Sequence, residues 1–145
     1  MTGPRSYSAV FPMLFTLIAT LSCGSHHLQS VSITPATADA RQFANGQVPF
    51  VAKGVFDGSS TPVTLTSKDI LWCYGGGAGG TTPVSGVCAG NIVQFATVDQ
   101  NGLAQCTSSS FQGSVYILAG VATPSPNPDV GPQLKIFGSA VLTCP

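Results

Sequence analysis

Apolar side chains recur at every second position along much of this chain, and this period constrains the fold more than any other feature. The clearest run covers residues 48–56 (VPFVAKGVF), and shorter runs cover 31–33 and 115–119. The run 134–144 (LKIFGSAVLTC) is also rich in residues that favour strands. A period of two is that of a half-buried β-strand. The turn dipeptides that separate the runs are Asn45-Gly46, Asp57-Gly58 and Asn101-Gly102.

Helices are disfavoured by both pattern and composition. After the first 22 residues no segment keeps helical spacing over three turns, and the chain contains no Glu and few Lys. Several short strands with frequent turns predict an all-β fold, either a sandwich or a small barrel. A length of 145 residues suits one domain of this kind.

The N-terminus has the features of a secretory signal. Arg5 gives a positive start, and residues 9–21 form an apolar stretch shorter than the roughly 20 residues that span a bilayer. The alternative, a buried core helix, is disfavoured by Pro12 and by the terminal position. We therefore predict a signal peptide at 1–22 and a polar tether at 23–30.

The residues before Cys23 resemble a bacterial lipobox, in which the cysteine is lipidated and becomes the first residue of the mature chain. Thr20 departs from this pattern, because the usual leucine stands three positions before the cysteine. Lipidation of Cys23 would anchor the protein to a membrane of the cell envelope. Cleavage by an ordinary signal peptidase, which gives a secreted protein, is the alternative.

Four further cysteines remain in the predicted domain: Cys73, Cys88, Cys106 and Cys144. An even number in an exported chain predicts two disulfides, with three possible connectivities. A bond between Cys73 and Cys88 would close the glycine-rich loop between them and remove roughly 3 kcal/mol of unfolded-state entropy. We therefore favour Cys73–Cys88 with Cys106–Cys144. The pairing Cys73–Cys106 with Cys88–Cys144 remains open.

Three stretches carry a resemblance to a known family. They are 31–36 (VSITPA), 46–59 (GQVPFVAKGVFDGS), and 96–103 (ATVDQNGL) followed by 113–119 (GSVYILA). Their order and spacing resemble bacterial immunoglobulin-like domains of group 2, and Trp72 stands at the family's tryptophan position. The resemblance covers residues 31 to about 121. It implies an immunoglobulin-like β-sandwich of about seven strands.

The chain departs from the family pattern in two places. Insertions at 74–92 and 122–133 elaborate a domain that we place at 31–145, and the four cysteines are not a general family feature. The side chains that we expect between two facing sheets are Phe50, Phe56, Trp72, Val98, Val115 and Ile117. Burial of each would contribute roughly 1.5–3 kcal/mol.

The glycine cluster at 75–80 matches the spacing G-x-G-x-x-G, yet it does not lead into a helix. A phosphate-binding turn needs the N-terminus of a following helix, so we interpret the match as chance and expect no cofactor. Zinc is also disfavoured, because the chain has no C-x-x-C pair and its histidines, His26 and His27, lie in the predicted tether.

Catalysis and nucleic-acid binding have little support in the sequence. The five Asp residues are scattered, no G-x-S-x-G occurs, and beyond residue 22 four basic residues stand against five acidic ones. A nearly neutral chain lacks the basic field that attracts nucleic acid. We expect no enzymatic activity, and a secreted enzyme is the remote alternative.

Exposed aromatic and apolar residues indicate where a partner could bind. Tyr116 and Leu118 are expected on an outward face, and Phe111 lies in a Ser-rich stretch. We favour the interpretation in which the insertion at 74–92 folds over the first two. The family resemblance implies a non-catalytic surface module that acts in adhesion or in glycan or protein binding. A purely structural envelope lipoprotein, or spacer, is the alternative function.

Overall fold

The computed structural model describes residues 26–75, 86–89, 95–107, 112–124 and 131–145. In this part the chain is almost entirely β-structure, with two short 3-10 helices, η1 (Ala40–Gln42) and η2 (Ala44–Gly46). The described strands are β1 (Leu28–Thr34), β2 (Thr37–Asp39), β3 (Gln47–Pro49), β4 (Val51–Phe56), β5 (Val63–Thr64), β6 (Leu71–Gly75), β7 (Ala96–Val98), β8 (Leu103–Cys106), β9 (Gly113–Thr123) and β10 (Gln133–Cys144). The all-β prediction is confirmed.

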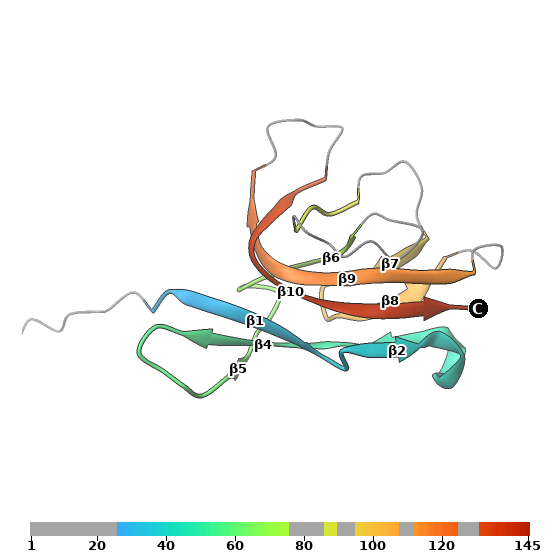
Figure 1. Cartoon of the computed structure of the whole chain (residues 1–145), viewed down its shortest axis with the longest axis horizontal. Helices are drawn as coiled ribbons and strands as arrows, with labels where there is room; N and C mark the ends of the chain where they lie inside the picture. The colour runs from blue at the N-terminus through green and yellow to red at the C-terminus, as the bar shows by residue number, and fades with distance from the viewer. Residues whose placement is uncertain (1–25, 76–85, 90–94, 108–111, 125–130) are drawn as a thin grey trace, which may run out of the picture.

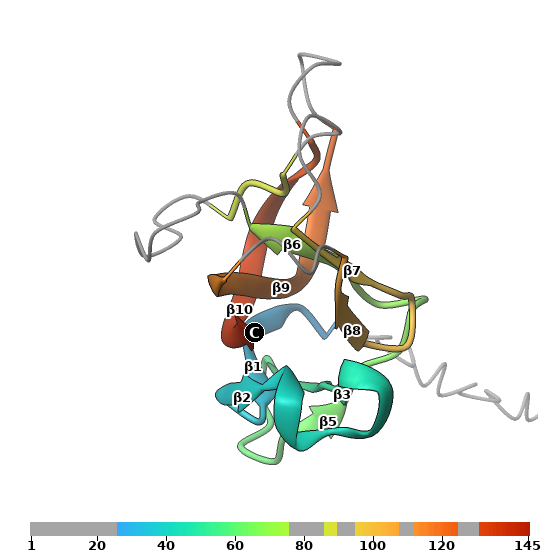
Figure 2. The same ribbon diagram turned by 90° about the vertical axis from the view of Figure 1, so that its right-hand side faces the viewer.

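The strands form two layers around one core. One layer is the four-stranded sheet with the order β2-β10-β9-β6. The other combines two sheets, β1-β4-β5 and β3-β8-β7, which share the continuous segment that contains β3 and β4. Figure 1 shows β9 and β10 lying over β1 and β4. Figure 2, seen along the strands, shows β7 and β8 at one side of the core.

The strand order is that of the immunoglobulin fold. If β1, β3–β4, β6, β7, β8, β9 and β10 take the letters A to G, the two layers read A-B-E-D and C-F-G, as in immunoglobulin domains. The count exceeds seven for three reasons. Strand B is divided at Phe50, whose N–H donates to the Gly102 carbonyl; β2 adds a parallel partner to β10; and β5 adds a partner to β4.

The core lies between the layers and contains most of the expected residues. Phe50 and Trp72 are 1% and 8% exposed, and Val115 and Ile117 are fully buried. Phe56 and Val98 are only partly buried and pack against the cluster from its margin. The alternation in β4 places Ala52 inside and Val51 and Lys53 outside, as the period of two predicts.

Several element boundaries differ from those expected. Strand β1 begins at Leu28, which pairs with Phe56, so residues 28–30 belong to the sheet and not to a tether. Strands β9 and β10 extend to Thr123 and Gln133, which pair with each other inside the expected insertion at 122–133. Continued hairpin pairing satisfies backbone hydrogen bonds that a loop would leave to water. Residues 1–25 and the cluster at 76–80 lie outside the described residues.

Both favoured disulfides are present. Cys73 bonds to Cys88 with a Cα–Cα distance of 5.6 Å, and Cys106 bonds to Cys144 with a Cα–Cα distance of 5.8 Å. The alternative connectivity is therefore wrong. Cys106–Cys144 joins the end of β8 to the end of β10 and so links the two layers, whereas Cys73–Cys88 joins β6 to the segment 86–89.

Leu118 does not face a partner, so the less favoured of the two interpretations of this residue is wrong. Its side chain is fully buried in a second apolar cluster with Cys88 and Leu134. The segment 86–89 covers this outer face of the sheet, because the N–H of Cys88 donates to the Pro132 carbonyl and that of Ala89 to the Tyr74 carbonyl. The favoured interpretation, in which the 74–92 insertion folds over this face, holds for the segment 86–89, which is the part of the insertion beyond β6 that the structure describes.

Candidate binding site at the pole of the sandwich

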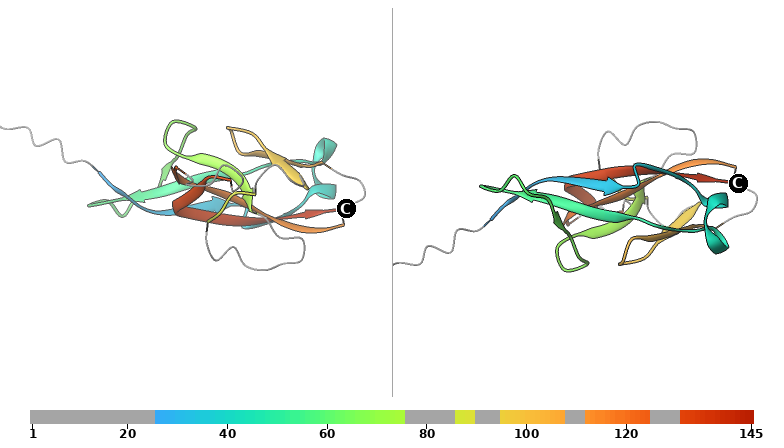
Figure 3. Two further views of the ribbon diagram at one scale, coloured as in Figure 1. Left: turned by 90° about the horizontal axis from the view of Figure 1, so that it is seen from above. Right: turned by 90° about the horizontal axis from the view of Figure 1, so that it is seen from below.

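A cavity of about 390 Å³ opens at the end of the sandwich where β10 ends. Arg41, Phe43, Asn45, Gln105 and Thr107 supply its functional side chains, and Gly46 and Cys106 also line it. Figure 3 shows η1 and η2 at the same end of the molecule as the last residue of β10. We call this space the polar-end cavity, because it lies at one pole of the sandwich.

The two 3-10 turns bring one wall of the cavity into place. Ala40 is buried and holds η1 on the core, and the N–H of Phe43 donates to the Ala40 carbonyl. Asn45 then takes a left-handed conformation with φ 58°, and the chain reverses into β3. Asparagine and glycine tolerate this conformation better than other residues, which is why Asn-Gly suits the turn.

The opposite wall comes from β8. Gln47 in β3 pairs with Gln105, so the residues just after the turn lie beside the end of β8. Gln105 and Thr107 are exposed, and Thr107 donates its N–H to the Phe95 carbonyl. Backbone pairing therefore fixes the distance between the wall with Asn45 and the wall with Gln105.

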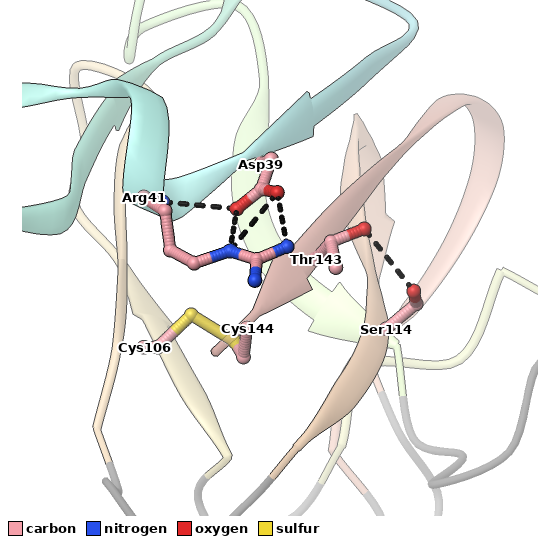
Figure 4. Close-up of a disulfide and its surroundings, with 6 residues drawn as sticks. All are labelled: Asp39, Arg41, Cys106, Ser114, Thr143 and Cys144. Carbon is pink, nitrogen blue, oxygen red and sulfur yellow. Dashed lines mark hydrogen bonds and ion pairs between the residues drawn. A yellow bond between two sulfur atoms is a disulfide. The ribbon is translucent and has the colours of Figure 1, made fainter.

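Arg41 is held by a single carboxylate. Asp39 accepts the backbone N–H of Arg41 at 3.0 Å, and its Oδ2 accepts from the Arg41 Nη2 at 2.7 Å. Figure 4 shows that the other terminal nitrogen of the guanidinium points away from Asp39, towards the side of the Cys106–Cys144 disulfide. The Arg41 side chain is 66% exposed, so this nitrogen remains accessible to a ligand.

This contact changes the acidity of both partners. Side-chain hydrogen bonds from Arg41, followed by its backbone N–H, hold the pKa of the Asp39 carboxyl below its ordinary value. The side-chain hydrogen bonds to Asp39, followed by the attraction of its negative charge, raise the pKa of the Arg41 guanidinium. Since the folded-state pKa of Asp39 is lowered, its small contribution to stability is present above the unfolded-state pKa and is lost as the pH falls through the folded-state pKa.

Replacing Arg41 by alanine is expected to raise the pKa of Asp39 part of the way towards its ordinary value, because the side-chain hydrogen bonds are lost while the backbone N–H of residue 41 remains. Carbon-13 NMR titration of the carboxyl groups would measure it. Asp69 is an internal control, because hydrogen bonds from Thr66 chiefly lower its pKa. An unchanged Asp39 pKa in Arg41→Ala would contradict the contact.

Among the residues that the structure describes, two smaller cavities lie elsewhere on the domain. One of about 230 Å³ lies beside Trp72, with Gln100 and Asn101 at its rim. Another of about 260 Å³ lies between β6 and β7 and is lined by Tyr74, Val98 and Pro132 among others. Desolvation raises the pKa of the Tyr74 hydroxyl. Both cavities border the core, and the one beside Trp72 also has the polar side chains of Thr64, Thr66 and Ser67 in its lining.

The residues that the sequence nominated for binding do not lie at the polar-end cavity. Tyr116 is half-buried in the cluster with Leu118, and Phe111 lies outside the described residues. The sequence interpretation missed Arg41, Phe43 and Gln105 and took Asn45 only as a turn former. The available signal was Asp39-Ala40-Arg41, in which opposite charges two residues apart precede a turn.

Other observations bear on chemistry and membranes. Within the described ranges, no three His, Cys, Asp or Glu residues gather where a metal ion could bind them all. Within the same ranges, no helix has the length and apolar character needed to cross a bilayer. Comparison of the chain with protein-family models, with curated proteins and with solved structures finds no match. The group 2 resemblance therefore stays a prediction.

Proposed function

We propose that this chain is a non-catalytic immunoglobulin-like module of the bacterial cell envelope, exported, anchored by a lipid on Cys23, and active in adhesion or in ligand binding. The observation that carries the proposal is a β-sandwich of immunoglobulin topology closed by two disulfides. A rigid sandwich suits presentation of a surface to a partner, and many cell-surface domains have this architecture.

The disulfides support the exported location. Such bonds persist in oxidising compartments and are rare in the cytosol of mesophiles. Cys144 and Cys88 are 3% and 2% exposed, so their sulfurs are shielded from soluble thiols. Four oxidised cysteines leave Cys23 as the fifth, at the junction between the apolar stretch and the domain. This position is the one that lipidation requires.

The direction of the chain supports anchoring at one pole. The described chain begins at the end of the sandwich opposite to the last residue of β10 (Figure 1). If the lipid on Cys23 lies in a membrane, the membrane surface faces the end of the sandwich near Leu28, and the polar-end cavity opens away from the membrane. The same arrangement favours the second candidate function, a structural spacer that holds another element at a distance from the membrane.

Replacing Cys23 by serine is expected to move the protein from the membrane fraction to the soluble fraction of a bacterial host that exports and processes the full chain. The reason is that stable anchoring needs acyl chains, each buried CH₂ contributing about 0.8 kcal/mol. Fractionation with immunoblotting measures the distribution. Intact-mass spectrometry of the wild-type protein measures both the acyl groups and the loss of four hydrogens from two disulfides.

The matched control is Ser22→Ala, which keeps a small residue before the cysteine and should remain in the membrane fraction. Soluble wild-type protein with an unmodified Cys23 would overturn the anchor. Binding and spacer functions separate in a screen against glycans and envelope proteins, because only a binding module retains a partner.

A further inference from the structure

We propose that the polar-end cavity is a carbohydrate-binding site that takes a neutral sugar ring. This inference rests on the proposed function, because it names the ligand class of the envelope module. The relevant side chains are Arg41, Phe43, Asn45 and Gln105. Three properties of the cavity carry the argument: its size, its balance of charge and hydrogen-bonding groups, and its position on the fold.

The size suits a small ligand. Pockets for small molecules have volumes of about 300–1,000 Å³, and at about 390 Å³ the polar-end cavity lies at the lower end of this range. The cavities beside Trp72 and between β6 and β7, both lined by described residues, have volumes of about 230 and 260 Å³ and lie below it. The polar-end cavity is therefore suited to a single sugar ring.

The charge balance favours a neutral ligand. Arg41 is the cation at the cavity, and its charge is compensated by the carboxylate of Asp39 at 2.7 Å. An anionic ligand would gain little from a guanidinium whose charge Asp39 already offsets, and a cationic ligand would be repelled by Arg41. A neutral polyol meets neither difficulty, because hydroxyl groups can accept from the free face of the guanidinium without displacing the carboxylate.

The remaining polar groups match hydroxyls in both directions. The Asn45 and Gln105 side chains each carry an amide that donates and accepts, and they approach from opposite walls. Sugar hydroxyls also donate and accept, so alternating amides can satisfy neighbouring hydroxyls at once. Phe43 is partly exposed in the same cavity and offers an apolar ring for the C–H face of a sugar.

Backbone geometry keeps these groups in place before a ligand binds. Asn45 is fixed in a left-handed turn, Gln105 in a strand pair, and Arg41 by hydrogen bonds to Asp39. The Cys106–Cys144 disulfide closes the end of the sandwich beneath them. A site that is ordered in advance loses less entropy on binding.

The competing cavity beside Trp72 lacks an available aromatic face. Trp72 is 8% exposed, and its ring lies against the Gly102 turn, so that a Cβ built on Gly102 would stand 2.8 Å from the Trp72 Cζ2. Sugar recognition by stacking needs an open ring face. Phe43 has more exposed surface, and for this reason we assign the site to the polar end.

The test uses the full chain purified after export. An array carrying oligosaccharides of N-acetylglucosamine, galactose and mannose, with sialylated counterparts, identifies the ligand, and titration calorimetry measures affinity for the best neutral oligosaccharide. We expect binding of neutral sugars. Gln105→Ala should weaken that binding by about five- to tenfold, because one or two hydrogen bonds are lost.

Gln100→Ala is the matched control, since Gln100 is an exposed glutamine at the rim of the cavity beside Trp72. It should change affinity by no more than about twofold, as for a neutral surface substitution. Asn45→Gly removes the amide while it preserves the left-handed turn, and it should weaken binding as Gln105→Ala does. Circular dichroism confirms that each variant is folded.

Three outcomes would overturn the inference: no glycan bound, only sialylated glycans bound, or equal loss of affinity in Gln100→Ala and Gln105→Ala. These outcomes remain distinct from failure of the proposed function. If wild-type protein is lipidated and membrane-bound but binds no neutral sugar, the saccharide site is wrong and the envelope module stands. If the purified protein binds neutral sugar but Cys23 carries no lipid and the protein stays in the soluble fraction, the lipid anchor is wrong and the saccharide site stands.

Discussion

Replacing Gly102 by alanine is expected to lower the free energy of unfolding by about 3 kcal/mol or more, because backbone strain and a steric clash act together at this position. Gly102 has φ +81°, a conformation that costs an L-residue about 1–2 kcal/mol. The added Cβ would also stand 2.4 Å from the Phe50 carbonyl oxygen. Overpacking of this kind costs a further 1–3 kcal/mol or so.

The clash matters because a backbone hydrogen bond of Gly102 connects the β7–β8 turn to strand B at the junction of β3 and β4. Its carbonyl accepts the Phe50 N–H at 2.9 Å, at the point where β3 ends and β4 begins. Asp99 fixes the same turn by accepting the N–H groups of Asn101 and Leu103, both at 2.8 Å. Movement of the turn away from the Cβ would therefore break hydrogen bonds on both sides.

Gly58→Ala is the matched control, because Gly58 has φ +73° and no atom lies within 4 Å of its built Cβ. It should show the backbone strain alone, about 1–2 kcal/mol. Urea denaturation followed by Trp72 fluorescence measures both variants. Equal destabilisation would mean that the contact with Phe50 and Trp72 has no consequence, contrary to the expectation.

Removal of the Cys106–Cys144 disulfide is expected to cost about 4 kcal/mol, and removal of Cys73–Cys88 about 3 kcal/mol. The bonds close segments with sequence separations of 38 and 15, and in the chain-entropy model a longer loop gives a larger effect. The first bond also links the two layers, whereas the second holds a segment on one outer face. Loss of the first should therefore weaken the whole sandwich.

The experiment compares the double alanine variants Cys106→Ala/Cys144→Ala and Cys73→Ala/Cys88→Ala by thermal and urea unfolding. Each serves as the control for the other. If the Cys106→Ala/Cys144→Ala variant does not fold, the wild-type protein can be partially reduced instead. Mass mapping of the reduced cysteines then shows which of the two disulfides is the more resistant to reduction. A larger loss on removing Cys73–Cys88 would contradict the expectation, because it would make the outer segment the main source of stability.

Much of the fold was predictable because it rests on local pattern. Alternation in residues 48–56 indicates a strand with Phe50 and Ala52 inside, and the glycines after Asn45 and Asn101 indicate the turns. The even cysteine count and the short loop between Cys73 and Cys88 indicate that pairing. Each of these signals depends on neighbouring residues, so no knowledge of tertiary contacts is needed.

The errors arose where distant segments decide the outcome. Leu118 has the alternation of an outward residue, and it is buried because the segment with Cys88 pairs across its face. Strand β2 is three residues long and has no periodicity of its own; it exists because Thr37 and its neighbours pair in parallel with β10. The early start of β1 at Leu28 likewise depends on pairing with Phe56.

The sequence by itself determined that this chain forms strands, with turns at its Asn-Gly and Asp-Gly pairs and with Phe50 and Trp72 inside, because alternation and turn chemistry act over a few residues. Only the tertiary structure decided which outer face is covered and where a cavity opens. The polar-end cavity joins Arg41 to Gln105, 64 positions apart in the chain. Such proximity depends on the packing of η1 and the pairing of β3 with β8, which no local pattern encodes.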